Sequence, residues 1–186
     1  LIADLKAKNI KIHFTTDIIL DKKAQGFHQG IVLEIEEIKT YSLDNFLANM
    51  SSDQNIRLVM LDHLEDPHNF GAIIRTSEAL GIAGIIIPND RGVGITPTVI
   101  KTSVGAISYL KIIRVPNLQV AIKKLKEHNF WLVGTDMDGT DYRKINYNMS
   151  TCLVIGNEGK GMSNVIAKNC DYIAKIPMKG HINSLN

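Results

Sequence analysis

The chain has 186 residues, enough for one medium-sized domain or for a domain with a small appendage. Hydrophobic residues make up 45% and charged residues 22%, a composition typical of globular proteins rather than of disordered chains. No apolar run approaches the roughly 20 residues of a membrane-spanning helix, and no segment has the pattern of a signal peptide. A net charge of +2 neither indicates nor excludes a nucleic-acid partner. We therefore set aside membrane, secreted and collagen-like proteins.

Charge divides the chain at about residue 55. Residues 1–54 carry 6 basic and 8 acidic residues, net −2, whereas residues 55–186 carry 15 and 11, net +4, so the second part is the better candidate for nucleic-acid binding. Within residues 1–39, the segments Asn9–Phe14 and Gly30–Ile35 predict strands and Ile18–Asp21 predicts a turn or short helix, which together indicate a small α/β module. Residues 40–54 combine an apolar cluster with a polar run and predict a short helix followed by a linker.

Residues 55–186 alternate short apolar segments with amphipathic ones. The predicted strands are Leu58–Leu61, Gly84–Ile87, Leu110–Val115, Phe130–Gly134, Cys152–Gly156 and Tyr172–Ile176. Helices are predicted to follow Asp66-Pro67, Thr96 and Asn117, because Asp, Thr and Asn are good N-caps and proline suits the first helical position. This alternation predicts a parallel α/β sheet with helices on both faces.

The two cysteines, Cys152 and Cys170, lie in or near predicted strands and form no Cys-x-x-Cys pair. That placement favours buried free thiols in a reducing compartment, such as the cytoplasm, over a disulfide or a zinc ribbon.

Three polar, glycine-containing segments follow predicted strands, where parallel sheets bind ligands. In the first, Asp66–Arg75, the helix start could attract an anion and Arg75 could bind a phosphate. The alternative is that Asp66 only caps the helix and Arg75 pairs with Glu78, and spacing alone favours that alternative.

The second segment, Gly156–Ser163, has three glycines in six residues and therefore an unusual backbone. It matches neither a phosphate-binding Gly-Lys-Ser/Thr loop nor Gly-x-Gly-x-x-Gly, and the carboxylate of Glu158 suits a hydroxyl, an amine or a cation rather than a phosphate. The third segment, Ile176–Asn186, could surround a planar ring with backbone groups, although alone it is a weak signal.

Other candidates fit no site. His63 and His68 lack the spacing of paired metal ligands on a helix. The acidic run Asp136, Asp138 and Asp141 lacks the glycine position and closing glutamate of an EF-hand, so we expect no metal. The aromatic pair Phe130 and Trp131 is predicted to belong to the core.

Together and in this order, the three segments resemble the signature motifs of the SpoU-like family of SPOUT RNA 2′-O-methyltransferases. The first motif, Asp-Pro-x-Asn-x-Gly-x-x-x-Arg, is matched by Asp66, Pro67, Asn69, Gly71 and Arg75. The second, Gly-x-Glu-x-x-Gly, is matched by Gly156, Glu158 and Gly161. The third, Ile-Pro-Met-x-Gly followed by Ser-Leu-Asn, is matched by Ile176, Pro177, Met178, Gly180, Ser184, Leu185 and Asn186.

The resemblance implies that S-adenosylmethionine is the cofactor, that no metal is needed, and that the α/β domain ends in a trefoil knot and forms a homodimer with sites near the subunit interface. By motif, the cofactor would be bound by Gly134, Thr135, Gly156, Ile176, Met178 and Leu185. The catalytic cluster would comprise Asn69, Arg75, Glu158, Ser184 and Asn186. Because a guanidinium essentially never deprotonates, we expect Arg75 to bind a phosphate and stabilise the forming alkoxide rather than act as a base.

The resemblance also divides the chain. Residues 1–39 resemble the end of a small ribosomal-protein-like RNA-binding domain, residues 40–54 form the short helix and linker, and residues 55–186 form the methyltransferase domain. The His28-Gln29-Gly30 run is similar to the branch that acts on guanosine in large-subunit (23S) ribosomal RNA. Family members continue past Ser-Leu-Asn, and the chain starts at Leu1 without a methionine, so we expect part of a longer protein.

Three other interpretations stay open. Transfer RNA is the rival substrate, because the RNA contacts cannot be derived from the sequence. A catalytically silent RNA-binding protein of the same fold is the second, although the intact motifs argue against it. A nicotinamide-dependent oxidoreductase is the third, and the missing Gly-x-Gly-x-x-Gly argues against it.

Overall fold

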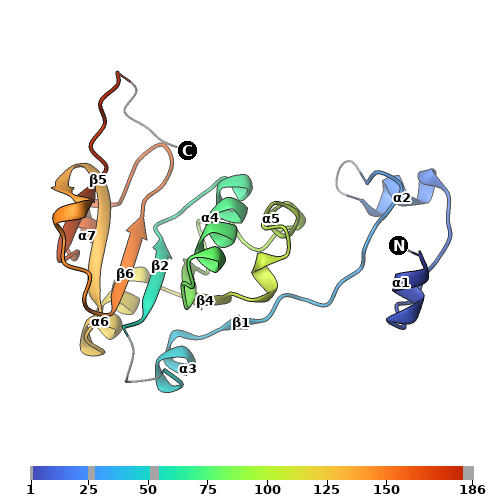
Figure 1. Ribbon diagram of the computed structural model, residues 1–186, viewed down its shortest axis with the longest axis horizontal. Helices are drawn as coiled ribbons and strands as arrows, with labels where there is room; N and C mark the ends of the chain where they lie inside the picture. Colours follow the sequence, from blue (N-terminus) through green and yellow to red (C-terminus); the bar gives the residue numbers. More distant parts are fainter. Residues whose placement is uncertain (1, 25–27, 51–54, 182–186) are drawn as a thin grey trace. The chain divides into compact units, whose positions relative to one another are not determined.

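The computed structural model describes residues 2–24, 28–50 and 55–181, and contacts divide the chain into two units, Leu1–Glu37 and Ile38–Asn186 (Figure 1). In the first unit, α1 spans Ile2–Ala7 and α2 spans Asp17–Lys23. The imidazole of His28 links the turn at Gly30 to α2, since Nδ1 accepts from the Gly30 N–H at 2.9 Å and Nε2 lies 3.0 Å from Asp21 Oδ1.

The strands predicted at Asn9–Phe14 and Gly30–Ile35 are wrong, because neither segment is paired in a sheet among the described residues. An alternating apolar pattern forms a strand only where a neighbouring strand satisfies its backbone groups. Without such a neighbour the apolar side chains of Phe14 and Leu33 stay exposed. The short helix expected near Ile18–Asp21 agrees with α2.

In the second unit, seven strands form one sheet in the order β1-β4-β3-β2-β6-β5-β7, and every neighbouring pair is parallel. Their bounds are β1 Thr40–Tyr41, β2 Arg57–Leu61, β3 Gly84–Pro88, β4 Lys111–Val115, β5 Trp131–Asp141, β6 Thr151–Ile155 and β7 Tyr172–Lys175. The parallel α/β prediction is therefore confirmed, with β1 as an additional edge strand. The trefoil knot stays a prediction, since the described residues do not test it.

Helices cover both faces because side chains alternate along each strand. On one face, α3 (Leu43–Ala48), α6 (Leu118–Glu127) and α7 (Asn164–Ala167) cover a core that includes Leu58 and Met60 of β2. On the other face, α4 (Pro67–Ala79) and α5 (Pro97–Thr102) lie side by side over Val59 and Leu61 of the same strand (Figure 1). Short 3-10 helices span Ala106–Ser108 and Tyr142–Lys144.

The helix predicted within residues 40–54 is present as α3. Its side chains Leu43, Phe46 and Leu47 are buried in the core beneath the sheet, and β1 pairs with β4. These contacts place α3 in the sheet unit, which begins at Ile38. The linker expected after this helix, at residues 51–54, lies outside the described residues.

Candidate active site

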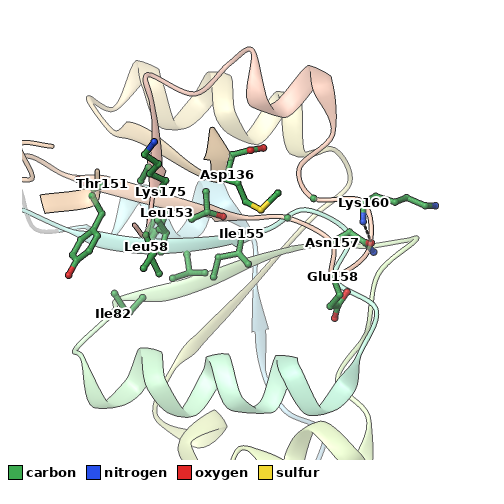
Figure 2. A pocket seen from close by; sticks show the side chains of 18 of the residues that line it. Leu58, Ile82, Asp136, Thr151, Leu153, Ile155, Asn157, Glu158, Lys160 and Lys175 are labelled. Carbon is green, nitrogen blue, oxygen red and sulfur yellow. Dashed lines mark hydrogen bonds between the residues drawn. The ribbon is translucent and has the colours of Figure 1, made fainter. Parts of the chain in front are cut away.

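A pocket of about 990 Å³ lies where the strand order reverses, beside β6 and β5. β2 has β3 as one neighbour and β6 as the other, and open parallel sheets bind ligands at the carboxyl ends of strands at such a switch point. Residues that follow β6, β5 and β7 line the pocket, and it extends along the sheet to Arg57 and Tyr147. Figure 2 shows Leu153 and Ile155 along β6, followed by Asn157 and Glu158 on the next loop.

The pocket has an apolar floor and a charged rim. Val59, Leu153, Ile155 and Ala174 contribute aliphatic side chains to its lining. Asp136, Lys160 and Lys175 bring charges of both signs to the same pocket, with Asp136 and Lys160 largely exposed to solvent. Such a lining suits a ligand that combines an aromatic or aliphatic part with charged groups.

The loop between β6 and α7 is closed by its own hydrogen bonds. The backbones of Asn157 and Gly161 exchange two hydrogen bonds of 3.0 and 2.9 Å. The Asn157 side-chain oxygen accepts from the N–H groups of Gly159 and Lys160, and its amide donates to the carbonyl of His63 at 2.9 Å. Asn157 therefore both shapes the loop and attaches it to the segment that follows β2.

Close contacts explain the glycine at position 156 and leave little room for a side chain at position 134. A Cβ on Gly156 would lie 2.3 Å from both Gly161 C and Met162 N, which are backbone atoms that cannot rotate away. A Cβ on Gly134 would lie 2.6 Å from Met162 Cε and 3.0 Å from Cys170 Sγ. The tight backbone expected of the Gly156–Ser163 segment is therefore present, and its cause is contact between the two ends of the loop.

Glu158 connects this loop to the start of α4. Its carboxylate accepts from the N–H groups of Glu65 at 3.2 Å and Asp66 at 3.0 Å, and from the Asn69 side-chain amide at 3.3 Å. Burial raises the pKa of Glu158, but the backbone donors of Asp66, Glu158 itself and Glu65, with the Asn69 amide, lower it further, so the net pKa lies below its ordinary value. The side chain is therefore an ionised carboxylate at neutral pH.

α4 begins where the sequence predicts. Asp66 is its N-cap and accepts from the His68 N–H at 2.8 Å, and Pro67 occupies the first turn. Gly71 faces α5 so closely that a Cβ would meet Thr102 Oγ1 at 1.8 Å. The motif thus serves helix capping and helix packing as well as the position of Asn69.

The structure brings only part of the predicted catalytic cluster together. Asn69 contacts Glu158, whereas Arg75 is exposed almost two turns further along α4. Within the described part of the chain, Arg75 makes no ion pair, so the alternative pairing with Glu78 is not observed. The predicted catalytic residues Ser184 and Asn186 lie outside the described residues.

More of the predicted cofactor residues than of the predicted catalytic residues lie together. Four of them line the pocket, namely Thr135, Gly156, Ile176 and Met178. Gly134 is buried at the adjacent position of β5, and Leu185 lies outside the described residues.

Sequence reasoning missed three residues that shape the site. Asn157, which attaches the loop, and Asp136, which lines the pocket from within β5, carry no individual signal beyond being polar. Asp62, which is buried at the end of β2, accepts a hydrogen bond from the Ser163 N–H at 2.7 Å. Asn157 and Asp62 follow the carboxyl end of a strand, which is the signal that could have found them, whereas Asp136 lies within β5.

Other sequence-based expectations have mixed outcomes. Phe130 is buried as predicted, but Trp131 is 41% exposed and stacks on Tyr172 with ring centroids 5.6 Å apart, so the core prediction is wrong for Trp131. Trp131 is the first residue of β5, at the start of the strand rather than in its buried middle. Both cysteines are free, with Cys152 buried and Cys170 half-buried.

Metal and membrane features are absent from the described ranges. There, no group of three His, Cys, Asp or Glu side chains could hold a metal ion. Asp141 from the acidic run is bound by Arg143, whose guanidinium and backbone hydrogen bonds lower the pKa of that carboxyl to about 2. Among residues 2–24, 28–50 and 55–181, no helix combines the length and apolar character needed to cross a bilayer.

Comparison with known proteins identifies relatives of this chain. Residues 56–186 match the SpoU rRNA Methylase family. A Staphylococcus aureus protein named for the TrmH family of tRNA/rRNA methyltransferases is 42% identical over 188 residues, which covers 100% of this chain and 76% of the relative.

Solved structures of methyltransferases also resemble this chain. The crystal structure of the SpoU methyltransferase AviRb from Streptomyces viridochromogenes, in complex with its cofactor AdoMet, has a TM-score of 0.72 and 31% identity, covering 81% of this chain and 60% of AviRb. A crystal structure of an RNA 2′-O ribose methyltransferase has a TM-score of 0.63 and 25% identity, covering 74% of this chain and 55% of that one. This chain therefore spans less than two thirds of the length of either structural relative.

Proposed function

Because the chain belongs to the SpoU rRNA methylase family, we propose that it transfers a methyl group from S-adenosylmethionine to a ribose 2′-hydroxyl of a structured RNA. The observation that carries this proposal is the position of Glu158, which lines the pocket while three hydrogen bonds attach it to the start of α4. That arrangement joins the motif that would bind cofactor to the motif that would bind RNA.

The pocket fits S-adenosylmethionine in volume and chemistry. Its 990 Å³ lies at the upper end of the range of about 300–1,000 Å³ for ligand sites. Aliphatic side chains of Leu153 and Ile155 suit an adenine ring, and the opposite charges of Asp136 and Lys160 suit an amino-acid group that carries both signs. The AviRb structure with AdoMet supports the same cofactor.

By motif and position, backbone and side chains of six residues would hold the cofactor, namely Gly134, Thr135, Gly156, Ile176, Met178 and Leu185. Gly156 admits no side chain because Gly161 and Met162 fill the space of a Cβ, so it would contact a ligand through its backbone. The Thr135 hydroxyl donates to the carbonyl of Val154 at 3.0 Å, so Thr135 would contact a ligand through its backbone groups.

When bound, the cofactor supplies an electrophilic methyl group on a sulfonium. The chain must then hold a weakly nucleophilic hydroxyl in line with that methyl, which is mainly a task of orientation. Arg75, exposed and without an ion-pair partner in the described ranges, would bind the phosphate beside the target ribose and stabilise the oxygen as its proton passes to that phosphate or to water. The Asn69 amide is hydrogen-bonded to Glu158, and by motif Asn69, Ser184 and Asn186 would complete the cluster around the hydroxyl.

We propose guanosine in large-subunit (23S) ribosomal RNA as the substrate, in a homodimeric enzyme of the cytoplasm. The His28-Gln29-Gly30 turn and the family's own description support ribosomal RNA. Transfer RNA is the second candidate, because the name of the S. aureus relative includes both RNA classes.

The test is transfer of labelled methyl from S-adenosylmethionine by the full-length protein into large-subunit ribosomal RNA and into bulk transfer RNA, in separate reactions. Digestion then identifies the labelled nucleoside. We expect 2′-O-methylguanosine from ribosomal RNA, abolished by Arg75→Ala and unchanged by Lys123→Ala, which removes a charge from α6 on the opposite face of the sheet.

Other outcomes decide among the alternatives. Label only in transfer RNA would keep the reaction and overturn the substrate. No label in either RNA, despite tight RNA binding, would indicate a silent RNA-binding protein. If Arg75→Lys kept most of the activity, paired hydrogen bonds from a guanidinium would be irrelevant and the proposed role of Arg75 would be wrong.

A further inference from the structure

A buried carboxylate lies directly behind the loop that carries Glu158. Asp62 follows the last residue of β2 and is 1% exposed. One oxygen, Oδ2, accepts from the Ser163 N–H at 2.7 Å, and the other, Oδ1, lies 2.6 Å from His63 Nδ1. Both carboxylate oxygens therefore have a partner, and one of these partners, Ser163, lies at the C-terminal end of the loop.

The next residue connects Asp62 to the near end of the same loop. His63 has a positive φ of 60°, which is uncommon for a residue other than glycine and marks a sharp turn after β2. The turn presents the His63 carbonyl to the Asn157 amide, at 2.9 Å. Its imidazole is held by Asp62, so the same carboxylate contacts one anchor of the loop and supports the turn that forms the other.

We infer that Asp62 is a positioning residue for Glu158. Glu158 lies between the two anchors, Asn157 and Ser163, and its carboxylate must reach the N–H groups of Glu65 and Asp66. Loss of either anchor lets the loop move away from α4. The functional consequence rests on the proposed methyl transfer.

The position requires acceptors as well as a side chain of this size. Removing a carboxylate from water is costly, and an apolar side chain of similar size would avoid that cost but would leave the Ser163 N–H and the His63 ring without their acceptor. What the carboxylate adds is a pair of acceptors, directed at a loop N–H and at the ring of the turn. The side chain therefore serves to hold these two groups in place, and not only to fill space.

The first test compares Asp62→Asn and Asp62→Ala with Asp90→Asn in the full-length protein. The asparagine variant would retain an acceptor for Ser163 but lose the charge beside His63, whereas the alanine variant loses both. Asp90, exposed after the neighbouring strand β3, is the control for the same chemical change. We expect kcat to fall about 10- to 100-fold in Asp62→Asn, further in Asp62→Ala, and KM for RNA to stay unchanged, because a displacement of about 1 Å suffices for such losses.

A double-mutant cycle separates positioning from general damage. If Asp62 acts through Glu158, Asp62→Asn combined with Glu158→Gln has the kcat of Glu158→Gln alone, within about twofold. Multiplicative losses would overturn the inference, since they show that Asp62 affects activity independently of Glu158.

Amide hydrogen exchange distinguishes failure of this inference from failure of the proposed function, because it needs no substrate. We expect faster exchange at residues 157–163 in Asp62→Asn but not in Asp90→Asn, while the centre of the sheet stays protected. If the wild-type protein transferred no methyl but this exchange pattern held, only the proposed function would fail. Unchanged exchange at residues 157–163 would overturn the positioning role even in an active enzyme.

Discussion

Replacing Gly156 with alanine tests whether the glycine loop builds the cofactor pocket. The added Cβ would lie 2.3 Å from Gly161 C and from Met162 N, so the two ends of the loop must separate by about 1 Å to reach ordinary contact. They cannot separate freely, because Met162 is buried in the core and Glu158 is bound to the start of α4. Overpacking of this kind costs about 1–3 kcal/mol.

That cost can be measured either as weaker cofactor binding or as lower thermal stability. If the loop shifts, Kd for S-adenosylmethionine rises about 5- to 150-fold, and if it does not, the strain lowers Tm by about 2–4 °C per kcal/mol. Titration calorimetry and thermal unfolding measure the two. Gly159→Ala is the matched control in the same loop, since its Cβ would meet only Asn157 Oδ1, at 3.7 Å. The reasoning is refuted if Gly156→Ala matches Gly159→Ala in both Kd and Tm.

Three further predictions concern the same unit. The pKa of Glu158 is lowered on folding, so the stability that its ionised carboxylate contributes is present above the ordinary pKa of 4.5 and is lost as pH falls through the lowered pKa. The difference in unfolding free energy between wild type and Glu158→Gln should therefore shrink below pH 4.5. A difference that stays constant with pH would contradict this. Phe70→Ala, at a fully buried position of α4, should cost about 3–5 kcal/mol in denaturant unfolding. Leu80→Ala, 72% exposed, should stay within about 0.5 kcal/mol, and equal losses would show that burial is not the cause. Burial raises the pKa of the Cys152 thiol, and that of Cys170 to about 11, so a disulfide reagent should label neither rapidly in the native protein and both after unfolding; rapid native labelling of Cys152 would count against the buried position.

Much of the second unit could be predicted because its signals are local. Asp66-Pro67 specifies the start of α4, Asn117 accepts two N–H groups at the start of α6, and continuous apolar runs mark the buried strands. The same local rules failed in residues 1–39, where the predicted strands have no paired neighbour among the described residues.

The arrangement of the site depended on contacts between distant residues. The motifs named Asn69 and Glu158, which are 89 positions apart, but spacing could not show that they are hydrogen-bonded to each other or that Arg75 is exposed. Nor could it show that Asp62 holds Ser163, 101 positions later.

By itself, the sequence determined the strands predicted after residue 55, the starts of α4, α5 and α6, and which residue types carry the family's chemistry, because helix caps, glycines and apolar periodicity act within a few residues. Only the tertiary structure decided the strand order, the pocket beside β6 and the partners of Glu158 and Asp62. Parallel strands are joined through long crossovers, so their order is set by the packing of whole helices against the sheet rather than by any short pattern.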